Sequence, residues 1–307
     1  MGVLLTAAAI VASTAVGAWS EHRWRRSAAE AARRALLVIL YVVLPPIIFL
    51  NLAAAHIDLN EGVGVLLALA SNAATAAFVW WVASRVMRLS RPMVGAVIVS
   101  AMIANTAFVG FPLTIALLGR DHLSTAVLYD AFVSGPLLLL GAFAIGAAFG
   151  TKSGAGPRDR ALSFFTRNPP LYGAILGLLA PSSLAPEGLV HIAQVAVIGL
   201  LPVGFFAVGA TLAEDAEEGT LPLPPPLTRP VLLALAGRLL IAPAVLTLLA
   251  APLIDLPSTY RLLIAMPTAL NAMVVSHAYG LDNRTVAEAV TWSTAIVILV
   301  ALVSLLL

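Results

Sequence analysis

The chain has 307 residues, of which 61% are hydrophobic and 10% are charged, and its formal net charge is +2. A mean hydropathy of +1.00 leaves too little polar surface to cover a water-soluble globule of this length. The composition therefore places the chain in a lipid bilayer. The sequence contains no cysteine, which excludes disulfides and thiolate metal sites.

The hydrophobic segments predict ten transmembrane helices. About 20 apolar residues are needed to cross a hydrocarbon core of about 30 Å. The first candidate is interpreted as a retained helix, because its basic residues follow the apolar run, whereas a secretory signal has them before it. The ten candidates are residues 3–19, 35–55, 62–84, 92–119, 123–149, 168–185, 188–213, 230–252, 257–280 and 284–307.

The basic residues predict the orientation of these helices. Only Arg120 and Arg261 lie in the connections after even-numbered helices. By the positive-inside rule, the richer connections face the cytoplasm, so both termini lie outside the cell membrane. We interpret this basic charge as a topological anchor at the lipid surface, not as a nucleic-acid site. The connections after odd-numbered helices carry Arg23, Arg25, Arg26, Arg33, Arg34, Arg85, Arg88, Arg91, Lys152, Arg158, Arg160, Arg167, Arg229 and Arg284.

The two halves of the sequence repeat each other. Residues 65–70 recur letter for letter as residues 231–236, and the same offset of 166 carries Asn105 onto Asn271. Because five helices are an odd number, the second half enters the membrane inverted relative to the first. We expect repeats at 1–150 and 165–307, joined by a short cytoplasmic linker at 151–164. A second internal match aligns Leu44, Pro45 and Phe49 with Leu201, Pro202 and Phe206.

Predicted helices four and nine carry residues that interrupt helices. Proline inside a helix removes a backbone donor and costs about 3 kcal/mol. The ends of broken helices at mid-membrane would carry partial charges suited to an anionic group. The alternative is that proline merely kinks two packed helices and each asparagine bonds a neighbouring carbonyl. We expect the breaks at Ala104, Pro112, Pro267 and Ala272, and substrate binding by Asn105, Thr106, Thr268, Leu270 and Asn271.

Several of these motifs resemble those of the auxin efflux carrier family, which includes the plant PIN proteins and is distantly related to bile acid sodium symporters. They are residues 41–49 (YVVLPPIIF), 105–113 (NTAFVGFPL), 167–170 (RNPP) and 265–272 (AMPTALNA). The resemblance implies a ten-helix inverted-repeat fold in which helices four and nine cross. It further implies a scaffold of helices 1, 2, 6 and 7 that forms a homodimer, and a transport domain of helices 3–5 and 8–10 that moves as an elevator. Ala104 and Ala272 stand where the plant carriers have proline.

Two charged residues lie deep inside predicted helices, Asp130 in helix five and Arg238 in helix eight. Ionisable groups at such depth usually serve a pathway or pair with each other. Arg238, at the repeat position of Asn72, could attract an anionic substrate or balance Asp130, form a structural ion pair, or snorkel to the interface. Asp130 is the candidate for proton coupling, because low-dielectric surroundings favour the uncharged carboxyl. We expect His56, His277 and Glu288 at solvated helix ends.

These observations predict a secondary carrier in the plasma membrane that moves a small organic anion, auxin-like or another carboxylate, by alternating access. The sequence has no catalytic triad, phosphate loop or metal-ligand cluster, so we expect no enzyme activity, cofactor or metal. One alternative is a sodium symporter of the bile-acid type. The absence of a carboxylate from the crossing disfavours it, because hard cations prefer sites that often include carboxylates. Another alternative is a non-transporting membrane sensor.

Overall fold

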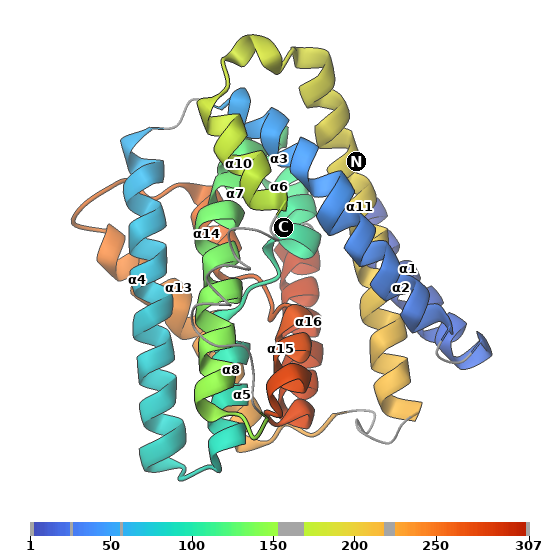
Figure 1. Cartoon of the computed structure of the whole chain (residues 1–307), viewed down its shortest axis with the longest axis vertical. Coiled ribbons are helices and arrows are strands. Elements are labelled where there is room, and N and C mark those ends of the chain that lie inside the picture. The colour runs from blue at the N-terminus through green and yellow to red at the C-terminus, as the bar shows by residue number, and fades with distance from the viewer. Residues whose placement is uncertain (1–2, 25–26, 56–57, 153–168, 218–224, 305–307) are drawn as a thin grey trace.

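The computed structural model describes all residues except 1–2, 25–26, 56–57, 153–168, 218–224 and 305–307. The described part of the chain is helical, and its β-type pairing is a single isolated bridge. Figure 1 shows the helices running mostly along one direction, with extended segments between them near the middle. Arg25, Arg26 and most of the predicted linker lie outside the described residues.

The first half of the chain forms helices that are joined partly by short loops and partly by wide π-helical turns. One such turn, Ile39–Val43, joins α2 to α3 just before Pro45 and Pro46, which lack the N–H groups that a regular helix would use. The helix α4 begins at a capping box, in which Asp58 accepts a hydrogen bond from the Glu61 N–H at 2.8 Å. The helices are α1 Val3–Trp24, α2 Ser27–Val38, α3 Leu44–Ala53, α4 Leu59–Trp81, α5 Arg91–Met102, α6 Phe111–Leu117, α7 Leu123–Tyr129 and α8 Phe143–Phe149.

Among the described residues, the second half contains two long helices, α11 and α16, and several shorter ones. The π-helical turn Gly237–Ile241 joins α12 to α13, and Gly280, at a φ of +67°, ends α15 in the left-handed conformation that glycine adopts readily. The helices are α10 Pro169–Leu179, α11 Glu187–Glu217, α12 Arg229–Ala236, α13 Ala242–Ala250, α14 Ser258–Ile264, α15 Asn271–Tyr279 and α16 Asn283–Ser304.

Within the part of the chain that the structure describes, six helical stretches are long and apolar enough to cross a membrane, as in a multi-pass membrane protein. Shorter apolar helices occupy Arg91–Met102, Thr106–Leu117 and Pro169–Leu179. The expected total of ten spans stays a prediction. The six stretches are Ser27–Ala53, Leu59–Val86, Arg120–Phe149, Glu187–Thr211, Arg229–Ala250 and Asn283–Ser304.

The second span begins at Ser27 and not at residue 35, so Arg33 and Arg34 lie inside a helix and not in a connection. Arg33 donates to both carboxylate oxygens of Glu214 on α11, at 2.7 and 3.2 Å. Arg34 pairs with Glu30 one turn earlier, at 2.5 Å. Arg33 therefore joins two helices, in addition to the anchoring role expected from its charge.

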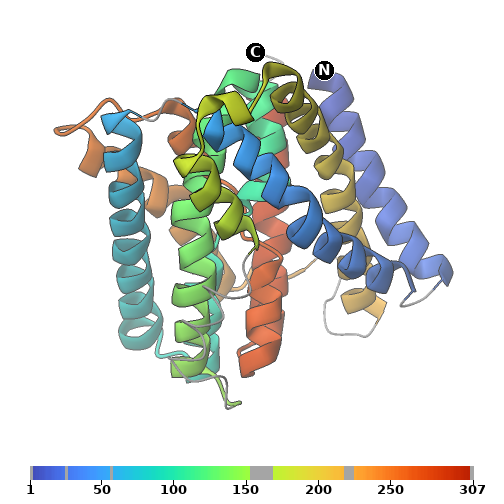
Figure 2. The same ribbon diagram turned by 45° about the horizontal axis from the view of Figure 1, so that its top comes forward.

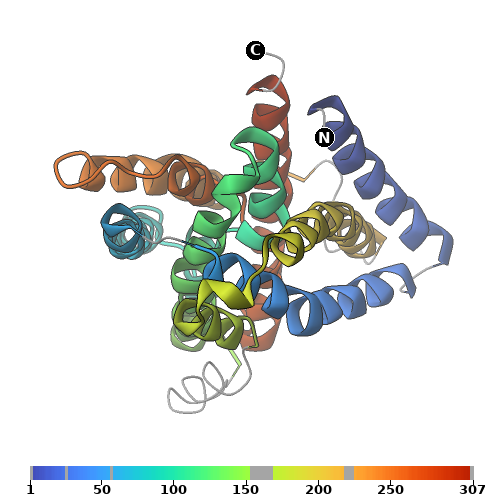
Figure 3. The same ribbon diagram turned by 90° about the horizontal axis from the view of Figure 1, so that it is seen from above.

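The helices pack in two groups. One group, which we call the α1/α11 group, contains α1, α2, α3, α10 and α11; the other, the α5 group, contains α4 to α8 and α12 to α16. Seen from above in Figure 3, α1 and α2 lie on one side of the molecule and α4 on the opposite side. Glycine permits the close approach of α1 to α11, because a Cβ on Gly17 would lie 2.1 Å from the Phe206 carbonyl oxygen. The two groups meet where α3 contacts α7 and α11 contacts α6.

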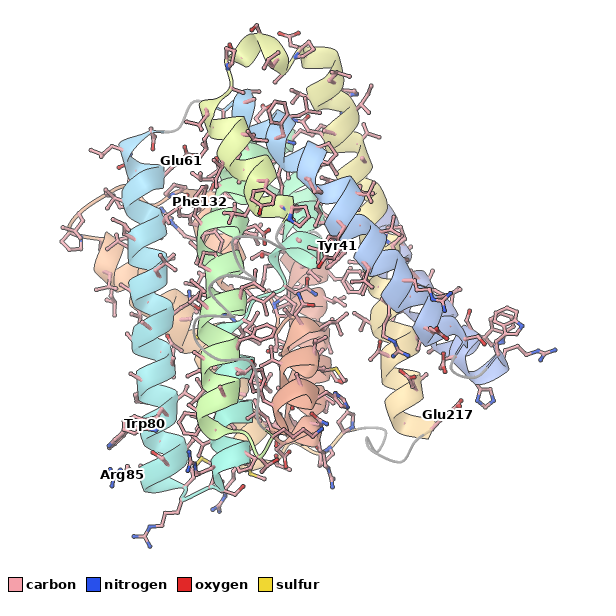
Figure 4. All side chains as sticks on the ribbon, viewed as in Figure 1. Tyr41, Glu61, Trp80, Arg85, Phe132 and Glu217 are labelled. Carbon is pink, nitrogen blue, oxygen red and sulfur yellow. The ribbon has the colours of Figure 1, made fainter. Side chains whose placement is uncertain are left out.

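The two ends of the molecule carry different side chains. Figure 4 shows Trp80 and Arg85 at one end and Glu61 at the other. The start of α1 and the end of α16 lie toward the same end of the molecule (Figure 2).

The expectation that Glu288 is solvated is wrong, because its residue is 1% exposed and its carboxylate accepts a hydrogen bond from Arg284 at 2.8 Å.

Candidate functional site

The fourth predicted span is interrupted directly before Asn105. The helix α5 ends at Met102, and Ile103 follows in an extended conformation with φ −95° and ψ 117°. The chain then enters a π-helical turn, Thr106–Gly110, that continues into α6. Ala104 thus lies in the break as expected. Pro112 lies within the continuous helical stretch Thr106–Leu117, directly after the wide π-helical turn, so it does not make the break.

The ninth predicted span is interrupted between α14, which ends at Ile264, and α15, which begins at Asn271. Pro267 lies in this break, whereas Ala272 is the second residue of α15. The two breaks pair as a short antiparallel bridge between Ala104 and Thr268. Such pairing satisfies backbone groups that would otherwise be unpaired in the middle of a membrane.

Two backbone hydrogen bonds hold this bridge, from Asn105 N–H to the Pro267 carbonyl at 2.8 Å and from Ala269 N–H to the Ile103 carbonyl at 3.0 Å. Ile103 and Ala269 are separated by 166 residues, the offset of the sequence repeat. The offset of the sequence match thus recurs in this one pair of the crossing, whereas Ala104 and Thr268 are 164 residues apart. Thr268 adds a bond from its hydroxyl to the Ser100 carbonyl at 2.8 Å.

A cavity of about 180 Å³ lies beside the crossing. Asn105, Thr106 and Asn271 line one part of it, and Asp130 lines it from the fifth span. Thr106 donates a hydrogen bond from its hydroxyl to the Asp130 carboxylate, so the acid is fixed directly to the broken segment. Asn271 is exposed and is the first residue of α15. The cavity therefore combines two amides, several hydroxyl groups, a carboxyl group and the start of a helix.

Four of the residues predicted for binding or coupling thus share one cavity, and the others do not line it. Thr268 is 1% exposed and is used in the crossing itself, through its hydroxyl and through its N–H, which donates to Ser293 Oγ at 3.0 Å. Leu270 packs against the apolar core. The structure therefore assigns Thr268 to the stability of the crossing.

The opposite wall of the cavity was not predicted from single residues. It comes from the α1/α11 group and includes Tyr41, Leu44, Pro169 and Pro170. These residues have no charge or amide, and the motifs at 41–49 and 167–170 that contain them carry the family resemblance without indicating that they lie beside the crossing. Ser134, which also lines the cavity, could have been found, because it follows Asp130 by one helical turn.

Arg238 is fully buried and does not line the cavity. Its Nη1 donates to the Met102 carbonyl at 2.9 Å, to the Ala101 carbonyl at 3.3 Å and to Asn72 Oδ1 at 3.4 Å. Its Nη2 donates to the Ile264 carbonyl. Within the described residues it forms no ion pair with Asp130, and it does not snorkel to an interface. Of the three interpretations that the sequence offered, the structural ion pair and the snorkelling side chain are therefore not seen in the described residues.

A model of a protein family described as "Membrane transport protein" matches residues 164–305. This stretch contains the second broken span, Arg238 and the motif at residues 265–272. No curated protein matches the chain. The match, to a model of the auxin efflux carrier/membrane transport family over residues 164–305, agrees with the resemblance carried by the sequence motifs.

Proposed function

We propose that the chain is a secondary active carrier that moves a small organic anion, auxin-like or another carboxylate, across the plasma membrane. The observation that carries this proposal is the cavity at the crossing, which lies between the α1/α11 group and the α5 group. A site between two groups of helices can be exposed to either side of the membrane when one group moves against the other. Its volume of about 180 Å³ suits a small solute.

The polar groups of the cavity support binding of a carboxylate. The N-terminus of α15, which begins at Asn271, carries partial positive charge, and this charge attracts an anion even though the N–H groups of Ala272 and Met273 already donate to the Ala269 and Leu270 carbonyls. The side-chain amides of Asn105 and Asn271 add donors to the same cavity. Together these groups can bind an anion without a basic side chain.

Asp130 supports coupling to protons. Among the described residues that line the cavity, it is the one carboxylate. Two negative charges about 4 Å apart repel by about 4 kcal/mol at an effective dielectric constant of about 20. An anion therefore binds best when Asp130 carries a proton, and anion and proton travel together.

An elevator movement of two inverted repeats is part of the proposal. The pairing of Ile103 with Ala269 at the repeat offset supports the symmetry. Two glycine contacts also support the symmetry. Gly17 approaches the carbonyl of Phe206, and Gly177 approaches the carbonyl of Phe49, which is the counterpart of Phe206 in the repeat. In this proposal the α1/α11 group is the scaffold and the homodimer interface, and the α5 group carries the substrate.

A flux assay in proteoliposomes tests the function. Vesicles with the purified protein are given a panel of radiolabelled carboxylates under imposed pH, sodium or voltage gradients. We expect gradient-driven uptake of at least one carboxylate, and its loss in Asn105→Ala and in Asn271→Ala.

Asn60→Ala is the matched control, because Asn60 lies at the start of α4 and lines a different cavity. This variant should transport like the wild type. Equal flux in all three variants would contradict the site, and the absence of flux for every carboxylate tested would contradict the substrate class.

A further inference from the structure

Arg238 is a buried positive charge whose partners are oxygen atoms of uncharged groups. Its residue is 0% exposed, and the described residues place no carboxylate within ion-pair distance of it. Removing a charge from water carries a large cost unless other groups compensate it. The compensation therefore has to come from the three carbonyls and the one amide that its guanidinium contacts.

These carbonyls belong to the ends of the two broken helices. Ala101 and Met102 are the last residues of α5, and Ile264 is the last residue of α14. Carbonyls at a helix C-terminus lack partners within the helix, and each C-terminus carries roughly half a negative charge. Two such ends amount to roughly one negative charge, which the single charge of Arg238 matches.

The breaks deprive these carbonyls of other donors. The Asn105 N–H, which would extend α5, donates to Pro267 instead. The Thr268 N–H, which would extend α14, donates to Ser293 instead. The crossing thus creates a cluster of unpaired oxygens, and Arg238 occupies its centre.

Backbone carbonyls gathered around one point, with an amide oxygen beside them, are also the ligands that bind monovalent metal cations. We propose that Arg238 is a fixed internal cation that takes the place of a bound metal cation at the helix crossing. The carrier therefore needs no sodium ion to hold its broken helices together or to transport. This inference rests on the proposed function and deepens it, because it excludes sodium as the coupling cation.

The repeat explains why one arginine is sufficient. Arg238 donates to Asn72, which occupies the equivalent position 166 residues earlier. The two positions meet beside the crossing, so a second arginine at position 72 would place two positive charges side by side. The neutral Asn72 instead accepts from Arg238 through its side-chain oxygen.

Chemical rescue of the purified protein tests the site without transport. Arg238→Ala leaves a space lined by carbonyl oxygens, and we expect its thermal unfolding midpoint to fall by roughly 10 °C. Guanidinium chloride at low millimolar concentration should restore most of this loss, because the free ion fits the vacated space. Urea, which has the same shape without the charge, and choline chloride should restore nothing.

Arg261→Ala is the matched control, since the Arg261 side chain is 57% exposed and its helix, α14, is one that Arg238 caps. Guanidinium should leave the midpoint of this variant and of the wild type unchanged. An Arg238→Ala midpoint equal to the wild-type midpoint, or equal recovery by urea and guanidinium, would overturn the proposal.

Flux measurements test the consequence for coupling and remain informative if Arg238→Ala does not fold. Wild-type flux should be the same when choline replaces sodium on both sides of the vesicle membrane, and so should the flux of Arg238→Lys, which keeps the charge. In Arg238→Gln, sodium should raise the flux roughly fivefold or more. A fall in wild-type flux without sodium would overturn the inference. Guanidinium rescue without flux of any carboxylate would instead retain the arginine site and reject the proposed substrate.

Discussion

Asp130 is connected to the crossing by one hydroxyl group, that of Thr106. If this carboxyl carries the transported proton, Asp130→Asn keeps the size and the hydrogen bond but cannot release or bind a proton. We expect the variant to lose the stimulation of uptake by a pH gradient while it still exchanges substrate across the membrane. Parallel assays of net uptake and of exchange with substrate inside the vesicles measure the two properties.

Asp121→Asn is the control for this change, because Asp121 lines a separate cavity. It should leave both net uptake and exchange unaltered. Uptake by Asp130→Asn that still follows the pH gradient would show that the proton is carried elsewhere, and proton coupling through Asp130 would have to be abandoned.

At the scale of single residues, the sequence predicts side chains that stand out chemically and fails for those that do not. Asn105, Asn271 and Asp130 are polar groups in apolar segments, and the structure brings all three to one cavity. Tyr41 belongs to the motif at residues 41–49, but only the packing of the helices places it in the opposite wall of the cavity. The partners of Arg238 are mostly backbone carbonyls, which every residue has, so no residue pattern could identify them.

At the scale of elements, the breaks could be located to within a few residues from proline and asparagine. The structure places the first break at Ile103–Asn105, and Pro112 enters α6 without interrupting it. The helix Thr106–Leu117 runs through Pro112 because a wide π-helical turn lies directly before this residue. The bridge between the two breaks, by contrast, depends on chain segments about 160 residues apart, and local patterns carry no information on it.

The contact between α1 and α11 makes a prediction about helix packing. A Cβ on Gly17 would lie 2.1 Å from the backbone oxygen of Phe206, so Gly17→Ala must push the two helices apart. Overpacking of this kind costs about 1–3 kcal/mol. We expect a lower thermal unfolding midpoint for Gly17→Ala, measured on the purified protein in detergent.

Gly199→Ala is the comparison for this variant, because it lies on α11 with no atom within 4 Å of the added methyl group. It should be as stable as the wild type or slightly more stable, since alanine favours the helix. If both variants had the wild-type midpoint, the close approach of α1 to α11 would be wrong.

At the scale of the whole molecule, the distribution of basic residues predicts which end faces the cytoplasm. Trp80 and Arg85 lie at one end and Glu61 at the other (Figure 4). Because the chain has no cysteine, single introduced cysteines report accessibility cleanly. A membrane-impermeant maleimide added to intact cells should label Asn60→Cys and should label Arg85→Cys only after the cells are opened. The reverse pattern would invert the topology and place both termini in the cytoplasm.

The elevator movement predicts that the two groups of helices must slide past each other during transport. Ala54, directly after α3, and Ser124, on α7, line one cavity of about 380 Å³ between the groups. A short bismaleimide that joins Ala54→Cys to Ser124→Cys should therefore stop carboxylate flux, whereas the same double variant should transport before cross-linking. The control is the pair Arg33→Cys and Glu214→Cys, which lies within the α1/α11 group. Arg33 Nη1 and Glu214 Oε2 are 2.7 Å apart, and cross-linking of the two cysteines should leave flux intact. Full flux after joining positions 54 and 124 would mean that the substrate crosses without relative movement of the two groups, because a short covalent link prevents any large displacement.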